Sequence, residues 1–213
     1  MTKLPPLNEA GPFDEKIDEK EEGQNEIQEK GFLARSSSFF LEVIKIVVLA
    51  GVTIALVRSF LFSPFAVIGQ SMEPTFYEKD YLIVDEISYR FRDPKRGEVV
   101  VFRSPVSSDF YLKRIIGLPG ERIKISDNKV VIYNDEYPQG DVINEVYLDE
   151  NTSGQDTITL GPNQYYVMGD NRDASYDSRR FGPVDKESIV GRVWVRGWPF
   201  SRISTFNTPD LGL

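Results

Sequence analysis

The chain has 213 residues and a formal net charge of -8, a length that allows one good-sized domain with a small subdomain. It has no basic excess, so nucleic-acid binding has little electrostatic support. The absence of cysteine and histidine excludes disulfides, metal sites built on these residues and a Ser-His-Asp triad. A hydrolase built from this chain must therefore take its general base from a carboxylate, a tyrosine or a lysine.

Residues 1–37 are polar and acidic and show no clear apolar period. Residues 1–30 contain nine acidic residues and four lysines, so their formal charge is -5. Such a composition predicts a disordered or weakly helical tail.

A mostly apolar segment follows at residues 39–62, and its uncharged part, Ile46–Val57, lies between Lys45 and Arg58. A membrane span needs about 20 residues. The segment reaches that length when the two flanking cations extend to the two interfaces. We therefore predict a single transmembrane anchor helix at 38–62, with a buried core helix as the alternative. The basic residues before the segment favour a cytoplasmic N-terminus.

After Pro64, short runs of β-branched and aromatic residues alternate with turn residues. These runs predict strands at Tyr81–Phe91, Gly97–Pro105, Phe110–Leu118, Glu121–Ile125, Lys129–Tyr133, Tyr165–Gly169 and Ile189–Trp198. No long helical period interrupts them. The pattern predicts a mainly β, antiparallel domain of barrel or sandwich type at 63–213, with a small inserted β subdomain at about 121–163.

Three segments within this domain carry residues suited to chemistry, and the first is GQSMEPTF at Gly69–Phe76. Gly69 allows close backbone approach, and Pro74 restricts the residue before it to extended geometry. Ser71 is expected at a turn after a strand, with its hydroxyl presented outward. A purely structural serine is the alternative.

The second segment is YLKRIIGLPGE at Tyr111–Glu121. Lys113 and Arg114 are expected to point to opposite faces of a strand, so that one cation faces the interior and the other does not. If the interior one is Lys113, burial lowers its pKa and favours the neutral amine. A neutral amine can accept the proton of a serine hydroxyl. A solvated lysine is the alternative.

The third segment is MGDNRDASYDSRRFGPV at Met168–Val184, which is rich in Asp, Arg, Asn and Ser. It lacks the Gly at position six and the Glu at position twelve of an EF-hand loop. Its mixed charges predict a rigid loop of ion pairs, and we expect no metal site.

Four ordered motifs, GQSMEPTF, RGEVVVFRSP, YLKRIIGLPGE and GDNRDASYDSRRFGPV, follow the apolar segment. In this arrangement the chain resembles the bacterial type I signal peptidases. The resemblance implies a membrane-bound serine endopeptidase with a Ser/Lys dyad, which removes signal peptides from exported preproteins through an acyl-enzyme. It implies no cofactor. It also implies a single-pass protein of a bacterial cell membrane, with the catalytic domain on the export (periplasmic, lumenal or extracellular) side.

The resemblance assigns roles to individual residues. Ser71 is the nucleophile, Lys113 is the general base and Ser175 orients the lysine amine. The Ser71 backbone N–H contributes to the oxyanion hole, where Gly69 replaces a serine that some members use as a second donor. The expected loop ion pairs are Asp170 with Arg114 and Asp177 with Arg179.

The resemblance further implies substrates with small residues at the first and third positions before the cut, bound as an added extended strand. The expected substrate-binding residues lie on two candidate strand edges: Phe65, Ala66, Val67, Ile68, Gly69, Phe110, Tyr111 and Leu112. The expected partners are preproteins and the lipid bilayer, without nucleic acid.

Two other functions remain open from the residues. One is a self-cleaving, repressor-type Ser/Lys protease, which would be expected to carry an N-terminal DNA-binding module instead of an acidic tail and an apolar segment. The other is a membrane-anchored β domain that binds a partner and performs no catalysis.

Overall fold

The computed structural model describes residues 39–54 and 62–212. The chain divides into two units, Met1–Ala55 and Leu56–Leu213. Residues 39–54 form a helix whose large apolar side chains are exposed. Within the described ranges, no helix combines the length and the apolar character required to cross a membrane. The predicted acidic tail and residues 38 and 55–61 of the predicted anchor lie outside those ranges.

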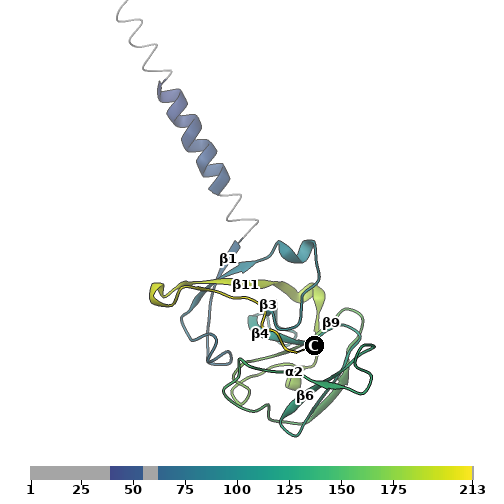
Figure 1. Cartoon of the computed structure of the whole chain (residues 1–213). Coiled ribbons are helices and arrows are strands. Elements are labelled where there is room, and N and C mark those ends of the chain that lie inside the picture. The colour runs from purple at the N-terminus through teal and green to yellow at the C-terminus, as the bar shows by residue number, and fades with distance from the viewer. Residues whose placement is uncertain (1–38, 55–61, 213) are drawn as a thin grey trace, which may run out of the picture. The chain divides into compact units, whose positions relative to one another are not determined.

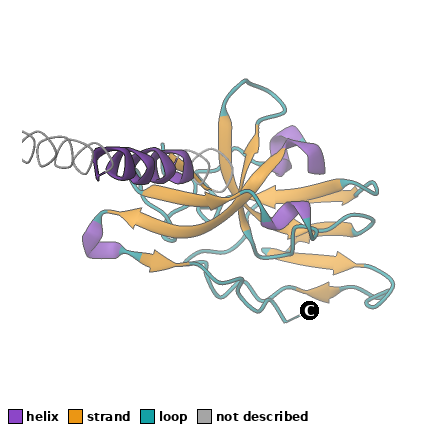
Figure 2. Cartoon of the chain, turned by 90° about the horizontal axis from the view of Figure 1, so that it is seen from above, coloured by secondary structure: helices purple, strands orange, loops and turns teal. Residues whose placement is uncertain are grey.

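The second unit is built mainly from antiparallel strands, as predicted, with only short helices between them (Figure 2). Its larger sheet has the strand order β1-β2-β11-β3-β4-β9-β10, and β12 pairs with β11. The bounds of these strands are β1 Phe62–Ala66, β2 Tyr81–Asp85, β3 Val99–Arg103, β4 Phe110–Gly117, β9 Gln164–Met168, β10 Val184–Asp185, β11 Ile189–Trp198 and β12 Ser204–Thr205.

A four-stranded sheet with the order β7-β6-β5-β8 completes the unit. Figure 1 shows β6 away from β1, with β3 and β4 between them. The strands of this sheet are β5 Arg122–Ser126, β6 Lys129–Tyr133, β7 Asp141–Val142 and β8 Asp156–Thr159. The short helices are η1 Ser88–Arg90, α2 Ser178–Phe181, η2 Lys186–Ser188 and η3 Phe200–Arg202.

The prediction of one strand over Tyr81–Phe91 is wrong, because β2 ends at Asp85. The Asp85 carboxylate accepts hydrogen bonds from the Ile87 N–H (3.1 Å), the Ser88 N–H (3.0 Å) and the Ser88 hydroxyl (2.6 Å). A side chain that satisfies the following backbone in this way favours a turn over a continued strand. The chain accordingly enters the 3-10 helix η1.

Two buried apolar clusters hold the two sheets together and position the loop that carries Ser71. One joins Ile116 of β4 and Met168 of β9 to apolar side chains of the smaller sheet, so the two sheets share a core. The other contains Met72 and Phe76, which follow Ser71 in the chain and are fully buried. Burying such side chains stabilises the fold by about 1.5–3 kcal/mol each. These two side chains therefore anchor the loop that carries Ser71.

Candidate active site

Ser71 lies in the loop between β1 and β2. Gly69 has a φ of +83°, a left-handed conformation that glycine adopts without strain. The loop closes through hydrogen bonds from the Glu73 N–H to the Gln70 carbonyl (3.1 Å) and from the Phe76 N–H to the Met72 carbonyl (2.8 Å). Ser71 itself remains partly exposed.

Lys113 lies on β4 and is only 5% exposed. Its Nζ donates hydrogen bonds to Ser71 Oγ (2.7 Å) and to the Leu112 carbonyl (3.0 Å). Burial lowers the pKa of Lys113 from 10.5 to about 8, although Asp177 and Asp170 act in the opposite direction. An amine with this pKa is neutral in a substantial fraction of molecules near pH 8, and at this distance it can accept the proton of a serine hydroxyl.

Arg114, the next residue on β4, is also buried, contrary to the expectation that only one of the two cations faces the interior. Its Nε and Nη2 bond to Asp170 Oδ1 (2.9 Å) and Oδ2 (2.6 Å), and its Nη1 donates to the Gly97 carbonyl (2.8 Å). The Tyr147 ring lies against the guanidinium, 3.9 Å from its carbon. The Asp170 carboxylate compensates the buried charge of Arg114 through two hydrogen bonds. Because Lys113 and Arg114 are both buried, both faces of β4 are covered.

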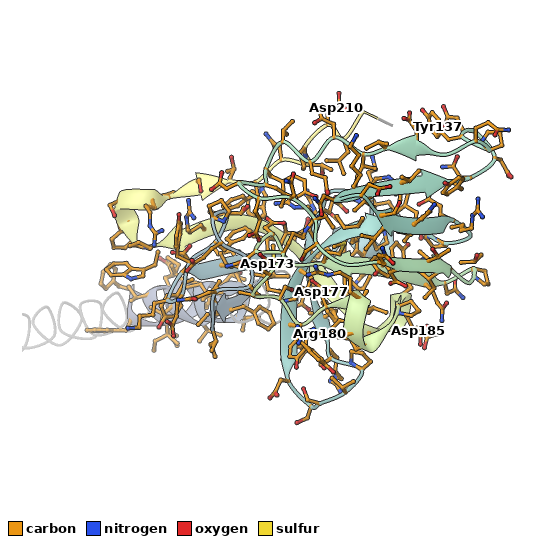
Figure 3. All side chains as sticks on the ribbon, turned by 90° about the horizontal axis from the view of Figure 1, so that it is seen from below. Tyr137, Asp173, Asp177, Arg180, Asp185 and Asp210 are labelled. Carbon is orange, nitrogen blue, oxygen red and sulfur yellow. The ribbon has the colours of Figure 1, made fainter. Side chains whose placement is uncertain are left out.

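Asp177 pairs with Arg179 through two hydrogen bonds of 2.9 and 2.8 Å. The Asp177 carboxylate also accepts the Gly169 N–H (3.1 Å) and the Arg179 N–H (3.2 Å) at the start of α2. Burial alone would raise the pKa of Asp177, but the Arg179 guanidinium, the Ser175 hydroxyl and the Gly169 N–H hold that pKa below its usual value. In Figure 3, Asp177 lies in the middle of the unit, away from Tyr137 and Asp210 at its edge.

Ser175 is buried, and its hydroxyl lies close enough to the Asp177 carboxylate to help lower the pKa of that group, although it makes no well-aligned hydrogen bond with a described residue. The two hydrogen bonds of Lys113 go to Ser71 and Leu112 and not to Ser175. The Ser175 hydroxyl and the Ser71 carbonyl both lie close to Gly169. A Cβ on Gly169 would lie 2.3 Å from Ser175 Oγ and 2.4 Å from the Ser71 carbonyl oxygen.

Sequence reasoning therefore missed Gly169 as a residue of the site. It is the second residue of the MGDN motif and directly follows β9. Its φ is not in the left-handed region, so no turn pattern marks it. Only the close approach of two other segments makes a side chain there overlap its neighbours.

The eight predicted substrate-binding residues all line one pocket of about 310 Å³, together with Ser71 and Lys113. The pocket lies between β1, an edge strand, and residues 110–112 of β4, which pair only with β3. Two unpaired strand edges therefore border it. Sequence reasoning missed six further lining residues: Gln70, Met72, Leu82, Val101, Ala174 and Tyr176.

Comparison with known proteins places the chain in one family. A family model described as signal peptidase, peptidase S26, matches residues 40–198. A probable signal peptidase I-2 of Synechocystis sp. is 38% identical over 172 residues, which cover 77% of this chain and 76% of the relative. Signal peptidase IB of Staphylococcus aureus is 32% identical over 183 residues, covering 80% and 95%. A crystal structure of a signal peptidase I from Enterococcus faecalis is 32% identical, with a TM-score of 0.42, and covers 47% of this chain and 97% of that one.

The resemblance inferred from the four sequence motifs is thus confirmed: the chain belongs to the signal peptidase family, peptidase S26.

Proposed function

We propose that this chain is a serine endopeptidase that removes N-terminal signal peptides from exported preproteins, with Ser71 as nucleophile and Lys113 as general base. The observation that carries the proposal is the 2.7 Å contact between Lys113 Nζ and Ser71 Oγ, two residues that line the pocket. The distance lies within the range over which a base takes a proton directly.

The reaction divides into two acyl transfers. Neutral Lys113 accepts the Ser71 hydroxyl proton as Oγ forms a bond with the scissile carbonyl carbon. Collapse of the tetrahedral intermediate breaks the C–N bond, and the protonated amine of Lys113 gives its proton to the leaving nitrogen. Lys113, neutral again, then activates a water molecule that releases the acyl group from Ser71.

The Ser71 N–H is the proposed donor to the developing oxyanion, and no described residue accepts a hydrogen bond from it. Ser175 is proposed to orient the Lys113 amine once substrate excludes water, since its Oγ is buried beside Gly169 and makes no well-aligned hydrogen bond with a described residue. A donor that is free before the reaction can be directed at charge that develops in the transition state.

The preprotein is proposed to bind as an extended strand between β1 and residues 110–112 of β4. Main-chain hydrogen bonds to unpaired strand edges supply affinity, and pockets for alternate side chains supply specificity. The small residues before the cut are proposed from the family resemblance, and their side chains are proposed to enter this pocket of about 310 Å³.

We further propose that the apolar segment at 38–62 anchors the protein in a bacterial cell membrane, with residues 63–213 on the export side. The exposed apolar side chains of the helix over 39–54 support this proposal. The full chain should remain in the membrane pellet after alkaline carbonate washing, and its release into the supernatant would contradict the anchor.

The deciding experiment measures cleavage of a purified preprotein by the full chain and by the variants Ser71→Ala and Lys113→Ala. Exposed residues of the same types provide the control variants Ser107→Ala and Lys124→Ala. We expect both site variants to lose activity and both controls to cleave as the wild type does. Wild-type cleavage by either site variant would show that the dyad is wrong. Cleavage of the chain itself, with no cleavage of preproteins, would favour a self-cleaving protease.

A further inference from the structure

Arg172 is a charged residue buried to 1% exposure in the turn that follows β9. Its Nε donates to the Gly169 carbonyl (3.0 Å). Its Nη1 and Nη2 donate to Glu145 Oε2 (2.9 Å) and Oε1 (2.5 Å). Such a bidentate pair fixes the orientation of the guanidinium as well as compensating its charge.

Glu145 belongs to a different part of the fold, the segment between β7 and β8 of the smaller sheet. Its carboxylate also accepts the hydroxyls of Tyr147 (2.8 Å) and Thr152 (3.0 Å). The preceding residues hold it in place: Ile143 is buried in the core shared by the two sheets, and the Asn144 N–H donates to the Leu211 carbonyl (2.9 Å). The Glu145 carboxylate is therefore fixed from the smaller sheet.

The turn that Arg172 supports lies directly on the nucleophile loop. The Asn171 N–H donates to the Ser71 carbonyl (3.1 Å), and Gly169 packs against the same carbonyl and against Ser175. A continuous series of contacts therefore runs from Glu145 through Arg172 and Gly169 to Ser71.

The position of the Arg172 guanidinium in this series depends on the negative charge of Glu145. Burial alone would lower the pKa of Arg172, but the Glu145 carboxylate outweighs that effect and the pKa is raised. Without Glu145, the buried guanidinium would lose its fixed carboxylate. Asp170 also acts on Arg172, although Asp170 is already engaged by Arg114. A shift of Arg172 toward Asp170 would move the turn that contacts Ser71.

We propose that Glu145 is a positioning residue for the peptidase reaction, which holds the Ser71 carbonyl and thereby the Ser71 hydroxyl in register with Lys113 through Arg172 and Gly169. This inference rests on the proposed function. Neither Glu145 nor Arg172 lines the substrate pocket. Loss of Glu145 should therefore lower kcat and leave KM unchanged, because misplacement of a reacting group by about 1 Å can cost about 100-fold in rate.

The test compares steady-state cleavage of a signal-peptide substrate by the full chain and the variants Glu145→Gln, Glu145→Asp and Arg172→Lys. Asp149→Asn, an exposed acidic residue of the same segment, removes the same charge and is the matched control. The Tm of each variant is measured, and kinetics are recorded at a temperature where all are folded. We expect Glu145→Gln and Arg172→Lys to lower kcat by roughly tenfold or more at constant KM. Glu145→Asp should lose less, and Asp149→Asn should match the wild type.

A folded Glu145→Gln variant with wild-type kcat would overturn the inference. So would a loss of kcat that matches the fraction of unfolded protein measured by circular dichroism. If Glu145→Gln does not fold, Glu145→Asp and Arg172→Lys decide by the same criteria. Ser71→Ala separates the two proposals: if it cleaves as the wild type does, the proposed function fails. If cleavage depends on Ser71 but is unaffected by Glu145→Gln, only the positioning role fails.

Discussion

The ring of Phe65 on β1 packs edge-on against the ring of Phe110 at the start of β4, with centroids 5.6 Å apart and an interplanar angle of 71°. Both rings line the substrate pocket. The contact thus joins the two strand edges between which the preprotein is proposed to bind, and it sets the spacing of those edges without involving Ser71 or Lys113.

Phe110→Ala should therefore weaken substrate binding more than it slows the chemical steps. Loss of an aromatic pair of this geometry should cost the fold about 0.5–1.5 kcal/mol beyond the buried area, and loss of a ring that lines the pocket should raise KM. We expect kcat to change less than KM. Phe200→Ala, which removes an exposed ring that does not line the pocket, is the control. An unchanged KM for Phe110→Ala would remove this ring from the binding site.

The pH dependence of kcat/KM should follow the protonation of Lys113. Burial lowers its pKa from 10.5 to about 8, and only the neutral amine accepts the Ser71 proton. We expect kcat/KM to rise with pH, with an apparent pKa near 8, and to fall about tenfold per pH unit below it. A profile recorded from pH 6 to 10 tests this expectation, and a flat curve would contradict a lysine base.

The same lowered pKa predicts that Lys113 destabilises the folded protein at neutral pH. Holding the pKa near 8 instead of 10.5 costs about 3 kcal/mol below pH 8, where the lysine of the unfolded chain is fully protonated. The cost fades between pH 8 and 10.5, because the unfolded chain then also loses the proton. Lys113→Met should therefore raise the free energy of unfolding, measured by urea titration, and the gain should shrink toward pH 10.5. An equal difference at pH 7 and pH 10.5 would exclude this origin.

Ser175→Ala should slow catalysis without destabilising the fold. Its Oγ makes no well-aligned hydrogen bond with a described residue, and the nearby Asp177 carboxylate keeps the bonds from Arg179 and from the Gly169 N–H, so the removal of the hydroxyl leaves no buried group without a partner. We expect kcat to fall strongly at unchanged Tm.

Ser178→Ala is the matched control for this prediction, because the buried Ser178 Oγ accepts the Val167 N–H (2.9 Å). Its removal should cost about 1–3 kcal/mol of stability and leave the kcat of folded enzyme intact. Wild-type kcat in Ser175→Ala would exclude Ser175 from the reaction.

Gly169→Ala should disrupt the site by steric overlap. The added Cβ would lie 2.4 Å from the Ser71 carbonyl oxygen, a backbone atom that can yield only if the Ser71 loop moves. We expect a destabilisation of about 1–3 kcal/mol, together with a loss of kcat. Gly197→Ala adds a Cβ whose nearest neighbour is 3.8 Å away and should be tolerated. Equal activity of the two variants would show that the Ser71 loop accommodates the overlap.

The strands could be read from the sequence where apolar residues continue without a competing side-chain hydrogen bond. The predicted strands Lys129–Tyr133 and Ile189–Trp198 have the observed bounds. The run after Tyr81 has a similar composition, but the Asp85 carboxylate satisfies the following N–H groups and ends the strand. Local capping geometry, and not hydrophobicity, sets that boundary.

The sequence also limited the chemistry, because a chain without histidine or cysteine that resembles this family leaves a lysine as the candidate base for Ser71. Because successive residues of a strand point to opposite faces, Lys113 and Arg114 are expected on different faces of β4, but this alternation does not reveal which of them faces the serine. That depends on which face of β4 the Ser71 loop covers, a contact between residues 42 positions apart.

By itself, the sequence determined the family, the antiparallel strands and the residue types able to perform the reaction, because these depend on composition, local periodicity and motif order. Only the tertiary structure decided that Arg114 is buried, that a side chain on Gly169 would overlap the Ser71 carbonyl, and that Glu145 reaches the site through Arg172. Each of these depends on the approach of segments far apart in the chain. Long-range packing brings those segments together, and no local pattern encodes it.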